Sequence, residues 1–132
     1  MRQQSYVILA DMDSVADFAA GLAYKVGEFL HQNFKTDGTP AYLKADRSAV
    51  TEIDLAADRL VTDEIHRNFP TDGLLSEELQ PVHKSGYSAT WVVDPLDGTT
   101  NYSLGLPIWG VSIARLVDGI PEIAAVHFPP LN

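Results

Sequence analysis

The sequence contains no cysteine, which excludes disulfide bonds and thiolate metal sites. No apolar run approaches the ~18 residues of a membrane-spanning helix, and the first residues lack the basic and apolar segments of a secretory signal peptide. Positive charge is also scarce, since 9 Lys and Arg stand against 18 Asp and Glu and give a net charge of −9. We therefore expect a soluble cytoplasmic protein with no membrane partner and no nucleic-acid partner.

The rest of the composition is that of an ordinary globular protein. Hydrophobic residues make up 45% of the 132 residues and charged residues 20%. Because this length suits one domain with a modest core, we expect residues 1–132 to form a single domain.

Two helices are predicted from the spacing of apolar residues. From Ser14 onward, apolar side chains recur at intervals of three and four residues, which predicts a helix over residues 14–32. A second helix is expected to begin after Thr51 and to end before Pro70. Asp54 lies three residues after Thr51, which is the spacing of an acidic capping box.

The remaining segments have the pattern of strands. Short apolar runs predict strands at residues 74–75, 89–93, 108–116 and 120–128. The dipeptide Asp118–Gly119 predicts a hairpin between the last two strands. Residues 41–50 are expected to form an irregular hairpin that carries Lys44 and Arg47. Helices followed by strands that are partly linked by hairpins favour an α+β fold over a regular βαβ repeat.

Chemically distinctive residues are concentrated directly after the strand predicted at residues 89–93. Two carboxylates, Asp94 and Asp97, follow this strand, and Gly98 and Thr99 come next. Carboxylates are hard oxygen ligands that suit Mg²⁺. Backbone N–H groups that follow a glycine can bind an anion such as phosphate. We expect a helix to begin at Gly98 and Thr99.

Other acids stand at the ends of predicted elements, with Asp54 at a helix start and Glu77 beside Glu78 at a strand end. Two Mg²⁺ ions a few ångströms apart can activate a water molecule and stabilise the leaving oxygen in one displacement. Asp94 is a natural bridge between two such ions, and the carbonyl of Leu96 is a further candidate ligand.

Each of these features has a simpler explanation when it is taken alone. Asp-Pro and Asp-Gly pairs are common in turns, an acid at a helix start stabilises the helix dipole, and paired glutamates are common in exposed loops. Lys44 and Arg47 could attract a phosphate, but the sequence alone favours a solvated basic pair. The four histidines lack the spacing of metal ligands, so we expect them to be structural or surface residues. Only the ordered combination of acids points to a metal site.

Three segments resemble a known family in their residues and in their order along the chain. Residues 94–101 read Asp-Pro-Leu-Asp-Gly-Thr-Thr-Asn, Thr51–Asp54 reads Thr-x-x-Asp, and Ser76–Glu78 reads Ser-Glu-Glu. In this order they resemble the inositol monophosphatase family of Mg²⁺-dependent, lithium-sensitive phosphatases. The family has glycine at the position of Ser76 and phenylalanine at the position of Tyr102.

The resemblance implies a set of metal ligands. Glu77, Asp94 and the carbonyl of Leu96 would hold a first Mg²⁺ ion, and Asp94 and Asp97 would hold a second. Glu77 would also reach a loosely bound third ion.

The resemblance also implies catalytic roles. Thr99, polarised by Asp54, would orient the attacking water and help to deprotonate it, with Glu77 completing the catalytic set. The substrate phosphate would be bound by the backbone amides of Gly98 and Thr99, with Lys44 facing the site.

Family members are about twice as long as this chain and form a layered αβαβα sandwich. The chain resembles the N-terminal, metal-binding half, which contributes two helices packed on an antiparallel sheet. The C-terminal half, which supplies a further aspartate to the second metal site, is absent. An uncovered sheet face or edge is expected, and we predict a homo-oligomer or a complementing C-terminal half as partner.

The expected activity is hydrolysis of a small phosphorylated alcohol, most simply inositol monophosphate, by metal-activated water. Fructose bisphosphate, histidinol phosphate and phosphoadenosine phosphate are alternative substrates. Two other functions stay open: a catalytically incomplete fragment, and a non-catalytic module that binds metal or protein.

Overall fold

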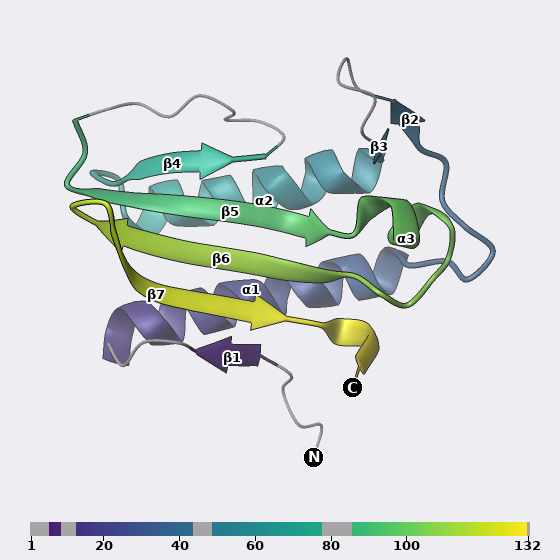
Figure 1. Cartoon of the computed structure of the whole chain (residues 1–132), viewed down its shortest axis with the longest axis horizontal. Coiled ribbons are helices and arrows are strands. Elements are labelled where there is room, and N and C mark those ends of the chain that lie inside the picture. The colour runs from purple at the N-terminus through teal and green to yellow at the C-terminus, as the bar shows by residue number, and fades with distance from the viewer. Residues whose placement is uncertain (1–5, 9–12, 44–48, 78–85, 132) are drawn as a thin grey trace.

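The computed structural model describes residues 6–8, 13–43, 49–77 and 86–131 (Figure 1). Along the chain the elements are β1 (Tyr6–Ile8), α1 (Asp13–Asn33), β2 (Tyr42–Leu43), β3 (Ala49–Val50), α2 (Glu52–Asn68), β4 (Gly73–Ser76), β5 (Ala89–Asp97), α3 (Thr99–Ser103), β6 (Gly110–Val117), β7 (Ile120–His127) and the 3₁₀ turn η1 (Pro129–Leu131). Within these ranges, no helix combines the length and apolarity that crossing a bilayer requires.

Five strands form the main sheet, in the order β1–β7–β6–β5–β4, and β2 pairs separately with β3. All neighbouring strands of the main sheet are antiparallel except β4 and β5, which run parallel. The predicted α+β class is confirmed. The antiparallel prediction is wrong for β4, which pairs in parallel with β5. Parallel neighbours need a connection of about a dozen residues, and the stretch from 77 to 88 in the sequence has that length.

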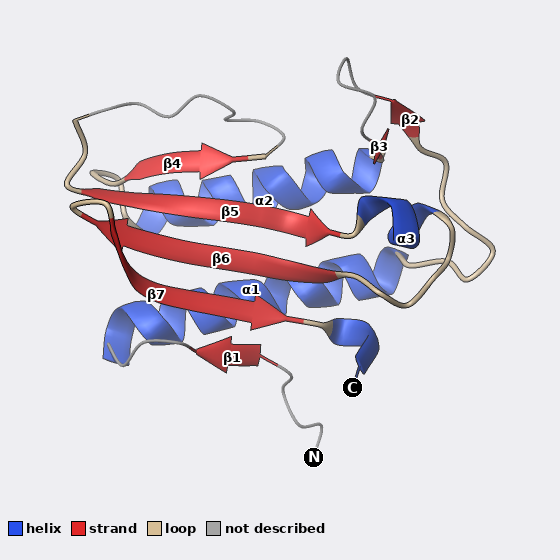
Figure 2. Ribbon diagram, viewed as in Figure 1, coloured by secondary structure: helices blue, strands red, loops and turns tan. Residues whose placement is uncertain are grey.

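Both long helices pack on one face of the sheet (Figure 2). Helix α1 contacts β6 and β7, and α2 contacts β4 and β5. An aromatic cluster of Phe18, Phe69 and Trp91 joins α1, the end of α2 and β5, with ring centroids 4.9 to 5.6 Å apart. Burying each large apolar side chain contributes about 1.5–3 kcal/mol to folding, so this face forms the core.

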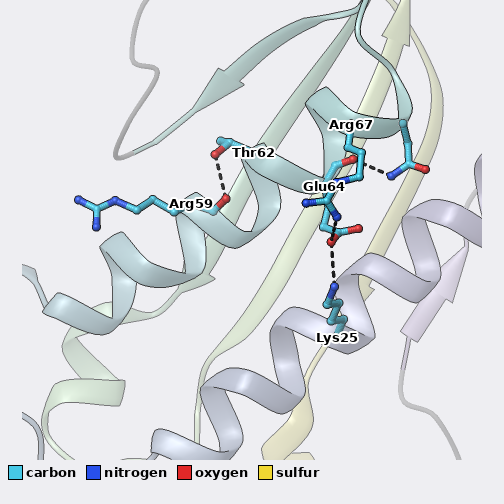
Figure 3. A network of polar contacts seen from close by, with 6 residues as sticks. Lys25, Arg59, Thr62, Glu64 and Arg67 are labelled. Atoms are coloured by element: carbon cyan, nitrogen blue, oxygen red, sulfur yellow. Dashed lines mark hydrogen bonds and ion pairs between the residues drawn. The ribbon is translucent and has the colours of Figure 1, made fainter.

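The two helices are also linked at the surface by Glu64 of α2 (Figure 3). Its carboxylate accepts from Lys25 Nζ of α1 at 2.9 Å and from Arg67 Nη1 at 3.0 Å. The hydrogen bond from Lys25 is the main reason why the pKa of Glu64 is lowered. Because the two basic side chains are exposed, each ion pair contributes about 0–1 kcal/mol. The alignment of the helices therefore depends chiefly on the apolar core.

The predicted element boundaries agree with the structure in most places. The helix predicted at 14–32 is α1, and the helix predicted after Thr51 is α2. The hairpin at Asp118–Gly119 joins β6 to β7, with positive φ at both residues. The strand predicted at 89–93 is too short, because β5 resumes its pairing with β6 at Asp97. Strand β1 was not predicted, since residues 1–13 give no clear pattern.

The opposite face of the sheet carries no helix in the part of the chain that the structure describes (Figure 1). Side chains of β5 alternate, so that Trp91 and Val93 are buried against the helices while Val92 is 37% exposed on the other face. Leu75 and Ala114 pair with Val92 and share its face. Within the described ranges, this apolar sheet face is therefore uncovered, as expected from the sequence. The self-association that it implies stays a prediction.

Candidate active site

The first part of the site is the start of helix α2, where Thr51 and Asp54 form a capping box. The backbone N–H of Thr51 donates to Asp54 Oδ2 at 2.8 Å, and the Thr51 hydroxyl donates to the same oxygen. The backbone N–H of Asp54 donates to Thr51 Oγ1 at 3.2 Å. This reciprocal bonding satisfies helix-start donors and holds Asp54, which is only 2% exposed, in one orientation.

The second carboxylate oxygen of Asp54 is bound by Thr99. Thr99 Oγ1 lies 2.6 Å from Asp54 Oδ1 and 3.3 Å from the carbonyl oxygen of Leu96. A hydroxyl has one hydrogen, and the shorter contact with the charged acceptor takes it. The lone pairs of Thr99 Oγ1 are then left to accept a hydrogen bond from a water molecule or a substrate.

Gly98 turns the chain between β5 and α3. Its φ of 89° lies in the left-handed region that favours glycine. A Cβ at this position would also lie 2.8 Å from the carbonyl oxygen of Ile108 and 3.3 Å from Trp109. Glycine is therefore required here on both grounds, and it brings Thr99 back toward α2.

A β-bulge places two acids on the same side of β5. Asp94 pairs with Ser112 and Asp97 pairs with Gly110, so three steps along β5 face two steps along β6. In a regular strand, residues three apart point to opposite faces, but the extra residue of a bulge cancels this offset. Because Ser112 and Gly110 share one face of β6, their partners Asp94 and Asp97 share that face as well.

The parallel pairing of β4 and β5 brings a third acid to the same place. Ser76 pairs with Val93, so Glu77, which follows the end of β4, lies beside Asp94 of β5. Ser76 and Val93 are both buried on the side of the helices. Glu77 directly follows Ser76, and Asp94 directly follows Val93. Alternation therefore directs both acids to the face opposite the helices.

Two neighbouring carboxylates act on Asp94. Burial, a hydrogen bond with Glu77, and the charges of Glu77 and then Asp97 together raise the pKa of Asp94 to about 8. Asp94 Oδ1 is buried and finds no hydrogen-bond donor among the described residues. Without a balancing positive charge, Asp94 is therefore held protonated at neutral pH.

The chemistry of these residues fits a hard divalent cation. The available donors are carboxylate and carbonyl oxygens, which Mg²⁺ prefers, and a cation would satisfy the buried Asp94 oxygen and neutralise the crowded charges. In the described ranges, no group of three or more His, Asp or Glu side chains is already spaced to enclose a metal ion.

The predicted site residues fall into two groups. Asp54 and Thr99 are in direct contact, and Asp94 interacts electrostatically with Glu77 and with Asp97. The carbonyl of Leu96 lies between the groups, since it is near Thr99 and within the bulge. Lys44, Arg47 and Glu78, which we also considered, lie outside the described residues.

Two polar clusters were not predicted from the sequence. At the opposite end of the sheet, Asp72 Oδ2 accepts from Trp91 Nε1 at 2.9 Å and from Arg115 Nε at 2.8 Å. The second cluster joins Ser76 to the buried carboxylate of Asp58. The spacing of Asp58 one helical turn after Asp54 was the only available signal for it.

Comparison with known proteins identifies relatives of this chain. A model of the inositol monophosphatase family matches residues 11–132. The chain is 37% identical over 114 residues to a histidinol-phosphatase of Chlorobaculum parvum, covering 86% of this chain and 44% of that protein. It is 34% identical over 122 residues to Nus factor SuhB of Escherichia coli, covering 92% of this chain and 46% of that protein.

The fold is shared with a solved structure. The IMPase of Thermotoga maritima superposes with a TM-score of 0.80 at 35% identity, covering 92% of this chain and 46% of that one. The chain therefore spans about half the length of the curated relatives that it matches.

Proposed function

Because the chain belongs to the inositol monophosphatase family, we propose that it forms the metal-binding part of a Mg²⁺-dependent phosphatase for small phosphorylated alcohols. One observation supports this above all: the hydroxyl of Thr99 is polarised by the buried Asp54 beside the crowded carboxylates around Asp94. Hydrolysis of a phosphate ester by a metal-activated water needs these two features together.

In this proposal the acids hold the cations. Glu77, Asp94 and the carbonyl of Leu96 hold one Mg²⁺ ion, Asp94 and Asp97 hold a second, and Glu77 reaches a third. When bound, these ions supply Lewis-acid stabilisation of phosphate oxygens and lower the pKa of a bound water.

The residues around Thr99 position the reactants. Thr99 donates its hydrogen to Asp54 and accepts a hydrogen bond from the attacking water, which aligns a water lone pair with phosphorus. Asp54 can accept the proton that Thr99 relays on its Oδ1 atom, since its other oxygen, Oδ2, is already occupied by the hydrogen bond from Thr51. The backbone amides of Gly98 and Thr99, together with Lys44, are the proposed phosphate ligands.

The substrate class follows from the relatives as a proposal. Inositol monophosphate is the simplest candidate, and the histidinol-phosphatase of Chlorobaculum parvum supports histidinol phosphate equally. Fructose bisphosphate and phosphoadenosine phosphate complete the set to be compared. All four are phosphate monoesters, so one phosphate-release assay ranks them.

The partner is proposed from the location of the acids. Glu77, Asp94 and Asp97 lie at the sheet face that α1 and α2 leave uncovered. A protein segment that covered this face would therefore also contact the acids. A complementing C-terminal half or a second copy of the chain would complete the site in this way.

A second function is supported by the other relative. The E. coli protein is named a Nus factor rather than a phosphatase. This favours a module that keeps the metal-site residues but acts through protein contacts. The two functions differ in their dependence on Asp94, since partner binding would survive Asp94→Asn and phosphate release would not.

The experiment is phosphate release from the four substrates, with and without Mg²⁺, by the wild-type protein and by the Asp94→Asn and Thr99→Val variants. The proposal predicts Mg²⁺-dependent release that both substitutions reduce by at least about 10²-fold. Release that is unchanged in Asp94→Asn would refute it.

A further inference from the structure

A buried hydrogen bond joins helix α2 to the end of strand β4. Ser76, the last residue of β4, donates its hydroxyl hydrogen to Asp58 Oδ1, although the two residues are 18 positions apart. Both side chains are inaccessible to solvent, with 1% and 0% exposure. The contact is therefore part of the interior and not a surface interaction.

A carboxylate is an unusual choice for this location. Asp58 lies on the buried side of α2, where its neighbours Ala57, Val61 and Ile65 make apolar contacts. Burying a carboxylate is unfavourable unless hydrogen bonds satisfy it, whereas an apolar side chain would pack between α2 and the sheet at no such cost. The need for adhesion between helix and sheet does not explain a carboxylate here, whereas the directional bond from Ser76 makes use of one of its oxygens.

The position of Ser76 gives that bond a consequence. Ser76 pairs with Val93, so the next residue on each parallel strand is a site acid, Glu77 or Asp94. Because side chains alternate, fixing the Ser76 hydroxyl toward α2 directs Glu77 to the opposite face, where Asp94 lies. The same hydrogen bond also fixes how far β4 extends along β5.

Helix α2 is thereby connected to both groups of site residues. Asp54, in its first turn, binds Thr99, and Asp58, one turn later, binds Ser76. A helical turn is rigid on the scale of these distances, so α2 fixes the water-orienting hydroxyl relative to the carboxylates.

On the basis of the proposed function, we propose that Asp58 and Ser76 are a positioning pair that holds Glu77 against Asp94 for cation binding. Neither residue contacts the substrate or a reacting atom. Their effect is transmitted through the end of β4.

The test compares Ser76→Ala, Asp58→Ala and the double variant with a matched control. Ser76→Ala is the primary variant, because it removes one oxygen atom and leaves the volume almost unchanged. The control is Thr62→Val, which removes another α2 hydroxyl, one that donates to the Arg59 carbonyl at 3.1 Å (Figure 3). Two quantities are measured: the Mg²⁺ dissociation constant by calorimetry, and amide hydrogen exchange of residues 73–77.

We expect Ser76→Ala to weaken Mg²⁺ binding by about tenfold, the usual effect of removing a partner that orients a ligand, and to accelerate exchange at residues 73–77. The double variant should bind no more weakly than Asp58→Ala, because both substitutions break the same bond. Asp58→Asn keeps an acceptor for Ser76 and should recover part of the affinity. Thr62→Val should change neither quantity.

Unchanged exchange in Ser76→Ala overturns the positioning role, and so does wild-type Mg²⁺ affinity in that variant. If the wild-type protein binds no Mg²⁺, the proposed function fails, but the exchange comparison still decides whether the pair positions the end of β4. The two proposals therefore fail on different measurements.

Discussion

Thr99 Oγ1 lies 2.6 Å from Asp54 Oδ1, although the two residues are 45 positions apart in the sequence. Asp54 is fixed from its other side by Thr51, and Thr99 follows the left-handed turn at Gly98. A helix start and a strand end are thus joined through one carboxylate. The candidate water-orienting group is rigid on both sides before any substrate binds.

Thr99 should be replaceable by serine but not by valine. Thr99→Val keeps the shape and removes the hydroxyl, so phosphate release in the presence of Mg²⁺ should fall by at least about 10²-fold. It also leaves a buried Asp54 oxygen without its donor, which should lower the free energy of unfolding by about 1–3 kcal/mol. Thr99→Ser should retain most of the activity. Thr100→Val, at an exposed neighbouring position, is the control, and an equal loss of activity there would contradict the assignment.

The stability of the metal-free protein should depend on the protonation of Asp94. Its pKa is raised from 3.8 to about 8, first by burial and then by Glu77, so the folded state binds this proton more tightly than the unfolded state does. The resulting stabilisation is complete below the unfolded value and is lost as the pH rises through about 8.

The substitution Asp94→Asn isolates this effect. At about pH 8 without Mg²⁺, the variant should be more stable than the wild type by about 1 kcal/mol, allowing for solvent screening of a partly exposed group. At about pH 3 the difference should nearly vanish, because Asp94 is then largely protonated in both the folded and the unfolded state. Thermal unfolding of both proteins at the two pH values measures this difference in stability. A difference between Asp94→Asn and the wild type that does not change with pH would show that the charge of Asp94 is not responsible.

Tyr102 should stabilise the contact between α3 and α1. Its buried hydroxyl donates to the carbonyl oxygen of Leu30 at 2.7 Å, near the end of α1, and burial raises its pKa. Tyr102→Phe should lower the free energy of unfolding by about 1–3 kcal/mol, because the carbonyl loses its partner in the interior. The exposed Tyr42→Phe is the matched control. Equal unfolding midpoints for the two variants would count against this role.

The cluster around Asp72 should affect stability without affecting cation binding. Asp72 accepts hydrogen bonds from Trp91 and Arg115, and Arg115 also pairs with Glu122 at 2.5 Å. Asp72→Ala should lower the free energy of unfolding by about 3 kcal/mol, since it leaves a partly buried guanidinium with one partner fewer. Because the cluster lies at the start of β4, away from the acids, the Mg²⁺ dissociation constant of the folded variant should stay within about twofold. A large change in affinity would show that the two ends of the sheet are coupled.

The sequence was sufficient to predict those features that depend on local patterns. The capping box follows from the spacing of Thr51 and Asp54, and the last hairpin follows from Asp118–Gly119. Helix α1 follows from a continuous 3.6-residue period. In each case the signal and the structure involve the same few residues.

Features that depend on pairing between distant segments were harder to predict. The parallel direction of β4 was not predicted, because hydrophobic periodicity does not encode the direction in which two neighbouring strands pair. The bulge in β5 appears only when Asp97 is aligned with Gly110 of β6. The bond between Asp58 and Ser76 was missed because a single buried acid on a helix resembles an ordinary surface acid in sequence.

Calorimetric titration of the protein with Mg²⁺ at about pH 7, in two buffers of different ionisation enthalpy, tests the central claim most directly. If Glu77, Asp94 and Asp97 hold the cation, the wild type binds Mg²⁺, and the heat differs between the buffers because Asp94 releases its proton on binding. Asp94→Asn should then lose both the binding and the proton release. Binding of equal strength in the wild type and Asp94→Asn, or no binding by the wild type, would contradict the account.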